Sequence, residues 1–279
     1  MSGKILVIGA TGTVGSHLVT QLLGAGDAVR VASRKARPVQ GAESVPFDFA
    51  DANTHAAAFE GVDRAFLLLP TGHLDIEGSL GRVIAAAAAR RVKLVLMSVL
   101  GADADDANPY RRAEIALAAS GTPHVILRPN WFADNFHSFW LAGIRQGVIA
   151  VPAAEGRTSF IDARDIAASA AAALRTDRFD GQAFNLTGPE ALGYAQAATI
   201  LSAATGWPIR YQPVEDAAFI AMLSGAGVPV DYAGFLAAIF HPVREGWTAG
   251  VSGDVATLTG AAPRSLLAYA ADNAARLRG

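Results

Sequence analysis

The stretch KILVIGATGTVGSHLVTQLL, residues 4–23, decides the fold. An aliphatic run typical of a buried strand is followed at once by three glycines and then by a segment of helical period. A chain that turns sharply from a parallel strand into a helix leaves the first helical N–H groups unpaired, and a pyrophosphate can accept them. We expect Gly9 to form the turn, Gly12 to let phosphate approach, and Gly15 to let the helix pack closely on the strand. The spacing is GxxGxxG rather than GxGxxG, so the motif alone leaves open a glycine-rich turn that binds nothing.

Composition narrows the class of protein. The chain has 279 residues, of which 52% are hydrophobic and 17% charged, enough for one large α/β domain or one domain with a smaller annex. The net charge of −2 and the scattered cations argue against nucleic acid as a partner. No apolar stretch approaches the roughly 20 residues of a membrane span, and the first apolar run is too short for a secretory signal. We therefore expect a cytoplasmic protein with no membrane segment.

Short aliphatic runs alternate with helical segments through the first half, which predicts an α/β fold with a doubly wound parallel sheet. The predicted strands are residues 5–8, 28–32, 44–47, 64–68, 94–98, 124–127 and 182–186. The predicted helices are residues 13–23, 54–59, 76–90, 110–119, 165–174, 194–204, 216–223 and 263–277.

The same pattern predicts two regions of unequal size. Residues 1–150 form the dinucleotide-binding domain, and its sheet is completed by residues of about 158–187. Residues 188–279 form a smaller, mostly helical region that binds the substrate. Cysteine is absent, which excludes disulfides and thiolate nucleophiles. His73, His137 and His241 share no ligand spacing, so we expect no metal site.

The end of the second strand bears on which dinucleotide binds. NAD sites place an acid there for the ribose hydroxyls, whereas NADP sites tend to offer arginine to the 2′-phosphate. Here Ser33, Arg34 and Lys35 follow the strand, and no acid occurs before Glu43. The planar fork of Arg34 suits a doubly charged phosphate, with Ser33 and Lys35 beside it. This favours NADPH over NADH, the alternative being that these cations only form a solvated loop.

Later strand ends supply further predicted cofactor contacts, because ligands lie outside the carboxyl ends of parallel strands. Asp48 and Phe49 can flank the adenine, although strand-end packing explains them equally well. The remaining predicted contacts at strand ends are Leu69, Pro70, Ser98 and Pro129.

Six segments together resemble the NmrA-like branch of the atypical short-chain dehydrogenases/reductases. They are ILVIGATGTVGSHLVTQLL, VASRKARP, RRVKLVLMSVLGAD, AEIALAASGTPHVILRPNWFADNF, TSFIDARDIAASAAAAL and APRSLLAYAADNAARL. That family includes quinone reductases, flavin-free azoreductases, reductases of plant phenolics and of imine intermediates, and nucleotide-sensing regulators. The resemblance implies nucleotide contacts at Gly9, Thr11, Gly12, Thr13, Val14 and Arg34. It also implies that Ser98, Pro129 and Asn130 approach the nicotinamide.

An aromatic segment, NWFADNFHSFW at residues 130–140, begins where the last strand of the first half ends. The resemblance implies that it opens the substrate pocket, with Trp131, Phe132, Phe136 and Trp140 as predicted substrate contacts. Their near-helical spacing is equally typical of a core face.

The chain lacks the proton-donating pair of most short-chain dehydrogenases, a Tyr with a Lys four residues later. Tyr110 is followed at that place by Glu114, and the other four tyrosines also lack the lysine. Hydride transfer itself needs no ionisable side chain, so acceptors that take a proton from water fit best. If side chains assist, Tyr110 and Asn130 are the predicted catalytic residues, with Arg112 as a further polarising group; alternatively, Tyr110 only packs at a helix start.

Two hypotheses follow. The first is an NADPH-dependent reductase of an aromatic or conjugated small molecule, a quinone or azo compound or else an imine, acting without flavin. The second is a non-catalytic NADP-binding regulator that senses redox state. Either would be a monomer or a homodimer.

Overall fold

The computed structural model describes residues 3–278. Among them, residues 3–129, 163–186 and 254–261 form one compact unit, here unit 1. Residues 130–162, 187–253 and 262–278 form a second, here unit 2. The polypeptide thus passes from unit 1 to unit 2 and returns twice, so each unit is assembled from segments far apart in the sequence.

Unit 1 is built on a parallel sheet of seven strands in the order β3-β2-β1-β4-β5-β6-β9. The strands are β1 (Lys4–Ile8), β2 (Val29–Ser33), β3 (Glu43–Pro46), β4 (Val62–Leu67), β5 (Lys93–Met97), β6 (His124–Pro129) and β9 (Gln182–Leu186). The order reverses between β1 and β4, which confirms the predicted doubly wound α/β fold. Such a reversal is where ligands bind in open parallel sheets.

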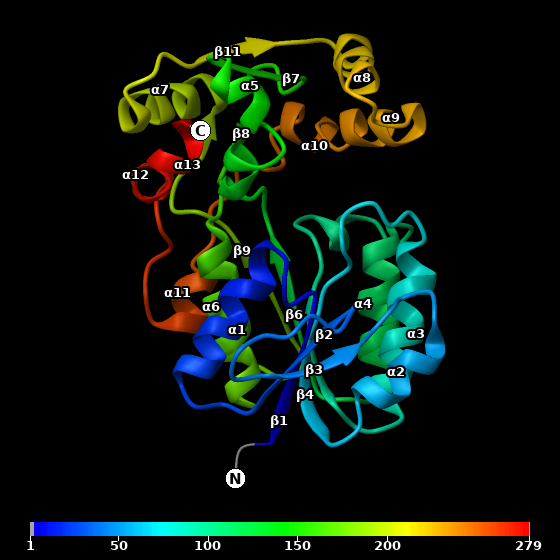
Figure 1. Ribbon diagram of the computed structural model, residues 1–279. Coiled ribbons are helices and arrows are strands. Elements are labelled where there is room, and N and C mark those ends of the chain that lie inside the picture. Colours follow the sequence, from blue (N-terminus) through cyan, green and yellow to red (C-terminus); the bar gives the residue numbers. More distant parts are fainter. Residues whose placement is uncertain (1–2, 279) are drawn as a thin grey trace. The chain divides into compact units, whose positions relative to one another are not determined.

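Helices cover both faces of this sheet (Figure 1). One face carries α1 (Thr13–Gly24), α6 (Ala163–Arg175) and α11 (Asp254–Thr259). The other carries α2 (Ala52–Ala58), α3 (Ile76–Ala88) and α4 (Pro109–Ala119), and a 3₁₀ turn, η1 (Ala102–Ala104), precedes α4. The central strand β1 is accordingly apolar after its first residue, and all four residues that follow Lys4 are buried. Burial on both faces explains why such a strand reads as a continuous aliphatic run.

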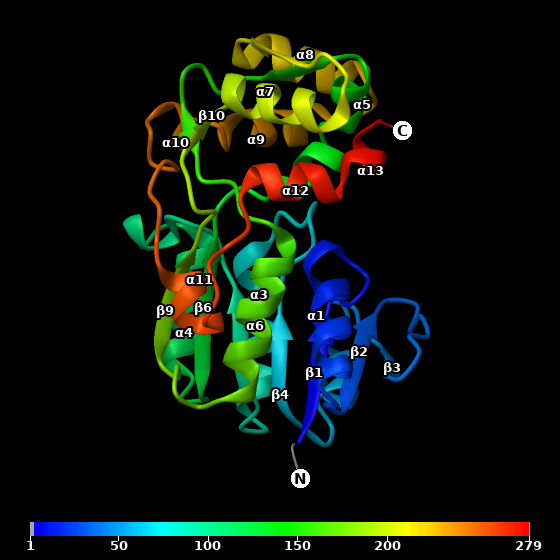
Figure 2. The ribbon, with the colours of Figure 1, turned by 90° about the vertical axis from the view of Figure 1, so that its left-hand side faces the viewer.

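Unit 2 is mostly helical, with two small two-stranded sheets (Figure 2). Its helices are η2 (Ala133–His137), α5 (Leu141–Arg145), α7 (Tyr194–Thr205), α8 (Asp216–Gly225), α9 (Val230–Ala238), α10 (His241–Arg244), α12 (Leu266–Asp272) and α13 (Ala274–Arg278). Strands β7 (Val148–Val151) and β11 (Arg210–Pro213) pair in parallel, and β8 (Arg157–Thr158) and β10 (Leu192–Gly193) pair antiparallel. An aromatic core that includes Phe136, Tyr194 and Phe240 holds these pieces together.

The structure differs from the sequence prediction at several boundaries. The first segment of unit 1 ends at Pro129, so the expected limit at residue 150 falls inside unit 2, although β9 does complete the sheet as expected. Residues 254–261, expected in the C-terminal region, belong to unit 1. The single last helix predicted over 263–277 is two helices, α12 and α13, with Asn273 between them. Within residues 3–278, no helix combines the length and the apolar character that crossing a bilayer demands.

Candidate functional site

The turn between β1 and α1 is shaped by its glycines. Gly9 has φ +78°, a left-handed conformation that a side chain would strain, and its carbonyl accepts the Gly12 N–H at 2.9 Å. A Cβ on Gly15 would lie 2.2 Å from the Gly9 carbonyl oxygen, so helix and turn touch backbone to backbone there. At Gly12 a Cβ would meet the same oxygen at 3.3 Å, which is tight but not prohibitive.

The N-terminus of α1 is open. Its N-cap residue is Gly12, which has no side chain to serve the first-turn N–H groups, and the first turn of this helix holds no acid. The three helices on the other face differ, because side chains of Asp51, Asp75 and Asn108 cap α2, α3 and α4. Thr11, Gly12 and Thr13 are exposed, whereas Val14 and Gly15 are buried. The exposed N–H groups and the positive end of the helix dipole suit a pyrophosphate.

The turn after β2 presents three cations. It is preformed: the Ser33 carbonyl accepts the Ala36 N–H at 3.0 Å, and the Ser33 hydroxyl accepts the Arg37 N–H at 3.1 Å. Arg34, Lys35 and Arg37 are exposed, and among residues 3–278 none of them forms an ion pair. By contrast, Arg30 of the same strand is buried and bridges to Glu43 at 2.8 Å. The unpaired guanidinium and ammonium groups fit a 2′-phosphate.

Other predicted cofactor contacts lie at the same edge of the sheet but vary in what they expose. The Asp48 carboxylate accepts the Ala50 N–H at 2.9 Å, which leaves its second oxygen for an adenine amino group. Phe49 is only 5% exposed and packs edge-on against His73, so its ring mainly belongs to the core of unit 1. Leu69 and Ser98 are also buried.

Pro70 and Pro129 complete that set. Pro70 is exposed three residues beyond the end of β4, and Pro129 is the buried last residue of β6. The carboxyl ends of β1, β2, β4, β5 and β6 therefore bring together the turn, the cations and these strand-end residues, as a dinucleotide site in such a sheet requires.

The two predicted catalytic residues lie in different units. Tyr110 is the second residue of α4 in unit 1 and is half-buried against the core of that unit. Asn130 begins unit 2, and its amide nitrogen donates to the Ser159 hydroxyl at 2.7 Å and to the Thr248 carbonyl at 2.8 Å, while its amide oxygen accepts the Trp131 N–H. With both amide hydrogens donated, Asn130 holds the backbone of unit 2 in place. The guanidinium of Arg112, the further polarising group of the prediction, is already paired with the Glu77 carboxylate at 3.1 Å.

The predicted substrate residues form part of the aromatic core of unit 2. The rings of Trp131 and Trp140 stack at 5.8 Å between centroids, and Phe136 packs against Trp140 at 5.0 Å. Phe136 has no exposed surface, whereas Trp131, Phe132 and Trp140 are partly exposed. Only the last three therefore have ring surface to offer a ligand.

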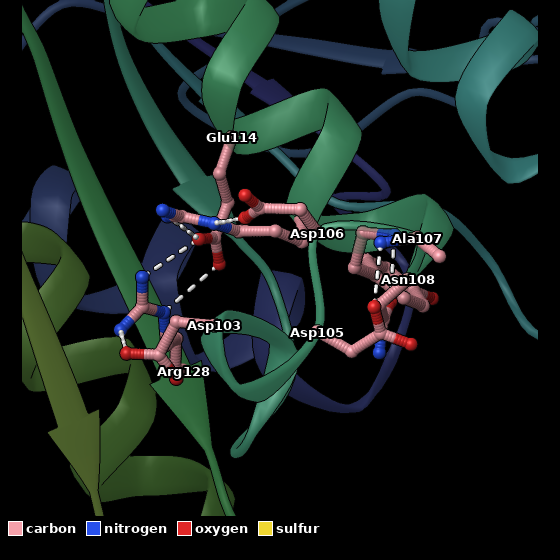
Figure 3. Close-up of polar contacts among 9 residues, drawn as sticks. Asp103, Asp105, Asp106, Ala107, Asn108, Glu114 and Arg128 are labelled. Carbon is pink, nitrogen blue, oxygen red and sulfur yellow. Dashed lines mark hydrogen bonds and ion pairs between the residues drawn. The ribbon is translucent and has the colours of Figure 1, made fainter.

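The sequence analysis missed a buried charged cluster in unit 1. Glu114 of α4 accepts two hydrogen bonds from Arg128 of β6, at 2.9 and 2.7 Å, and one from Arg111 at 3.3 Å (Figure 3). Burial by itself raises the pKa of Glu114, but the bonds and charge of Arg128, with smaller contributions from Ser98 and Arg111, outweigh it, so the pKa lies below its ordinary value. The signal was present: a glutamate on the apolar face of a helix and an arginine in an apolar strand each need a buried partner.

Among residues 3–278, no group of three or more His, Asp or Glu side chains is placed to hold a metal ion. The candidate site consists of the β1–α1 backbone turn, the cations after β2 and the residues at the strand ends.

Comparison with known proteins identifies the family of this chain. A family model described as the NmrA-like family matches residues 1–252. The chain belongs to the NmrA-like family. It is 33% identical over 273 residues to an uncharacterized oxidoreductase, YesF, of Bacillus subtilis, covering 97% of this chain and 95% of the relative. It is 31% identical over 283 residues to an NAD(P)H azoreductase of Xenophilus azovorans, covering 97% and 98%.

A solved structure of the NADPH-dependent quinone oxidoreductase QOR2 of Escherichia coli, complexed with NADPH, superposes with a TM-score of 0.86 at 26% identity. The match covers 96% of this chain and 99% of that one. The family assignment and the shared fold thus rest on nearly the whole chain, as the resemblance in the sequence predicted.

Proposed function

We propose that the protein is an NADPH-dependent reductase that passes hydride directly, without flavin, to an aromatic or conjugated acceptor: a quinone, an azo compound or an imine. Its family makes it an NAD(P)H-dependent oxidoreductase. The preference for NADPH and the acceptor class are the proposal. The observation that carries the cofactor part is the glycine turn under an uncapped helix, with unpaired Arg34 and Lys35 at the next strand end.

The residues present fit the dinucleotide in three separate ways. A Cβ would fill the space between Gly15 and Gly9, the α1 N-terminus lacks any side-chain cap, and no acid follows β2 where NAD ribose would need one. Thr11 and Thr13 are exposed beside the turn and can donate hydroxyl hydrogens to phosphate oxygens. Positioning by backbone N–H groups and cations is the chain's main contribution to binding.

The acceptor class follows from what the chain does not provide. When bound, NADPH supplies the hydride from its nicotinamide ring. Tyr110 is followed four residues later by Glu114, whose carboxylate is already bonded to Arg128, so the lysine of the usual Tyr and Lys pair is absent from that position. Quinones and azo groups are reduced without a strong protein acid, because water can supply the proton. Tyr110 remains the proposed side chain that steadies the acceptor, and Asn130 acts by holding Trp131.

The aromatic side chains with exposed surface supply the proposed acceptor contacts. Trp131, Phe132 and Trp140 are partly exposed and present flat rings suited to an aromatic acceptor. Phe136, which has no exposed surface, supports Trp140 from within the core.

A non-catalytic redox-sensing regulator is the second candidate. The observation that favours it is the same absence of a Tyr and Lys pair, together with the engagement of both amide hydrogens of Asn130. Such a protein would bind NADP as tightly as the reductase but would turn nothing over.

One experiment separates the two. Purified protein is mixed with NADPH and, in turn, a 1,4-naphthoquinone, an azo dye and a cyclic imine, and loss of NADPH absorbance is followed without added flavin. We expect oxidation with at least one acceptor. Tight NADPH binding with no oxidation across the whole panel would refute the reductase and support the regulator.

A further inference from the structure

The connection between β5 and α4, residues 98–108, leaves the sheet at the edge where the cofactor residues gather. Its first part continues the pairing of β5 with β6, since Ser98 N–H donates to the Leu127 carbonyl at 2.8 Å and Leu100 N–H to the Pro129 carbonyl at 3.0 Å. Beyond Gly101, which has φ +78°, the chain leaves the sheet and forms η1. From there on side-chain bonds add to the local backbone bonds of the loop, such as that from the Ala104 N–H to the Gly101 carbonyl at 3.1 Å.

Two arginines tie this loop to a single buried carboxylate (Figure 3). Arg128 donates to Glu114 through Nε and Nη2, and its Nη1 bonds to Asp103 in η1. Arg111 donates through Nε to Asp106 at 3.0 Å and through Nη1 to Glu114 at 3.3 Å. The loop is thus attached at two points to one carboxylate that itself belongs to α4.

The rest of the loop is shaped by local turns. The Asp105 carboxylate accepts the Ala107 N–H at 2.8 Å, and the Asn108 side chain caps α4 by accepting the Tyr110 N–H at 2.9 Å. These bonds fix the internal form of residues 105–110. The bonds made by Arg128 and Arg111 add side-chain contacts that join the segment to β6 and α4.

Burial divides the cluster into a core and an outer part. The side chain of Glu114 is 0% exposed and that of Arg128 8%, whereas Asp103 is 45% and Asp106 78% exposed. Breaking the inner pair would leave a buried charge without its partner, which destabilises the fold strongly. The outer carboxylates can be neutralised without that penalty, so they can hold the loop without being needed for folding.

We propose that the Asp103–Arg128 pair is a latch that holds residues 99–108 at the carboxyl ends of β5 and β6, beside the start of α4 with Tyr110, so that Asp103 is a positioning residue for acceptor binding. This rests on the proposed reductase function. The loop follows the carboxyl end of β5 and ends at Tyr110, the side chain proposed to steady the acceptor. Arg128 has its charge balanced by Glu114 already, and its remaining N–H group is directed to the loop.

The test compares Asp103→Asn with a matched control, Glu77→Gln. The control removes the exposed Glu77–Arg112 pair, which also involves α4 but not the loop. Hydrogen exchange of peptides covering residues 99–108 is measured without substrate, together with the Kd of NADPH and the KM and kcat for whichever acceptor of the panel is turned over. In Asp103→Asn we expect exchange in the loop and KM each to rise about two- to fivefold, as losing a half-exposed ion pair implies. In Asp103→Asn, the Kd of NADPH and kcat should stay within about twofold of their values in the unsubstituted protein. In Glu77→Gln, loop exchange, Kd, KM and kcat should all stay within that range.

Salt provides a second measurement on the unsubstituted protein, which needs no variant to fold. Raising ionic strength from about 0.05 M to about 0.5 M screens the exposed part of the pair, so KM should rise in the unsubstituted protein and much less in Asp103→Asn. Asp103→Glu, which keeps the charge, should restore part of the affinity for the acceptor.

Each outcome is informative. Unchanged exchange in residues 99–108 of Asp103→Asn overturns the latch. Faster exchange with an unchanged KM overturns the role in acceptor binding, and so does an equal rise in KM in Glu77→Gln. If none of the acceptors in the panel supports NADPH oxidation by the unsubstituted protein, the proposed function fails, and the role of Asp103 in acceptor binding fails with it. The exchange measurement still decides whether the latch exists.

Discussion

Gly15→Ala tests the close backbone contact between α1 and the β1–α1 turn most directly. The added Cβ would lie 2.2 Å from the Gly9 oxygen, 2.8 Å from the Gly9 carbonyl carbon and 2.9 Å from the Ala10 Cα. All three are backbone atoms, so no side chain can rotate away, and the Cβ stands roughly 1 Å inside ordinary contact range. Either α1 shifts off β1 or the Gly9 peptide moves.

The expected size of the effect comes from two opposing contributions. Replacing a helical glycine by alanine gains up to about 1 kcal/mol in helix propensity. Overpacking a tight contact costs about 1–3 kcal/mol, and here the displaced peptide also accepts the Gly12 N–H of the phosphate turn. We therefore expect Tm to fall by about 2–8 °C and NADPH affinity to drop at least tenfold.

Gly24→Ala is the matched control. It makes the same substitution at the last residue of the same helix, where a Cβ would meet nothing within 4 Å. Thermal unfolding by circular dichroism and NADPH titration calorimetry are run on both variants. The control should be unchanged or slightly more stable, with unchanged NADPH affinity. If Gly15→Ala matches the control in both measurements, the close approach of α1 to the turn does not shape the cofactor site.

Three further predictions concern charge. Arg34→Ala should weaken NADPH by about tenfold or more but NADH hardly at all, because only the 2′-phosphate needs the guanidinium; equal losses in titrations of the two cofactors would mean that the phosphate lies elsewhere. Glu114→Gln should lower the free energy of unfolding at neutral pH by about 3 kcal/mol. Since the fold lowers the pKa of Glu114 from 4.5, its contribution to the free energy of unfolding is present above that value and disappears as pH falls through the lowered pKa. Denaturation curves of the unsubstituted protein and Glu114→Gln should therefore converge in acid, and a difference in stability that stays constant with pH would contradict the ion pair with Arg128. Burial, with the nearby Glu155 carboxylate, raises the pKa of Tyr211 to about 12. The contribution of Tyr211 to the free energy of unfolding is therefore complete below pH 10 and is lost as pH rises toward 12. Tyr211→Phe should therefore flatten the fall in Tm between pH 10 and 12, and an unchanged slope would assign that fall to other groups.

Prediction from sequence succeeded where local pattern and structure coincide. The inner strands β1 and β5 are apolar after their first lysine, and a parallel sheet buried on both faces requires such runs. Helix α9 was missed because its sequence, VDYAGFLAA, is apolar on several sides and shows no clear period. Helix α11 has only six residues, and its place beside α6 depends on the chain returning to unit 1.

The same contrast separates the candidate site residues. Gly9, Gly15 and Arg34 could be named from spacing, because their roles depend on backbone conformation and on neighbours within about 30 residues. Phe136 could not be separated from Trp131 and Trp140, because which aromatic ring turns inward depends on packing against Phe160, a distant residue of unit 2. Asn130 was predicted from the family resemblance, but its hydrogen bonds reach Ser159 and Thr248, and only the folded chain shows them.

The sequence by itself determined the doubly wound sheet, the glycine turn and the cations that favour NADPH, since each follows from short-range sterics, periodicity and charge. The tertiary structure alone decided which polar groups are already engaged. Glu114 and Arg128 are 14 residues apart in the sequence, and Asn130 and Thr248 are 118 apart. Only the folded structure shows that each pair is hydrogen-bonded. A buried polar group must be paired, but the sequence does not say with what. For that reason the glycines of the β1–α1 turn were visible from the start, whereas the proposed latch on the β5–α4 loop was not.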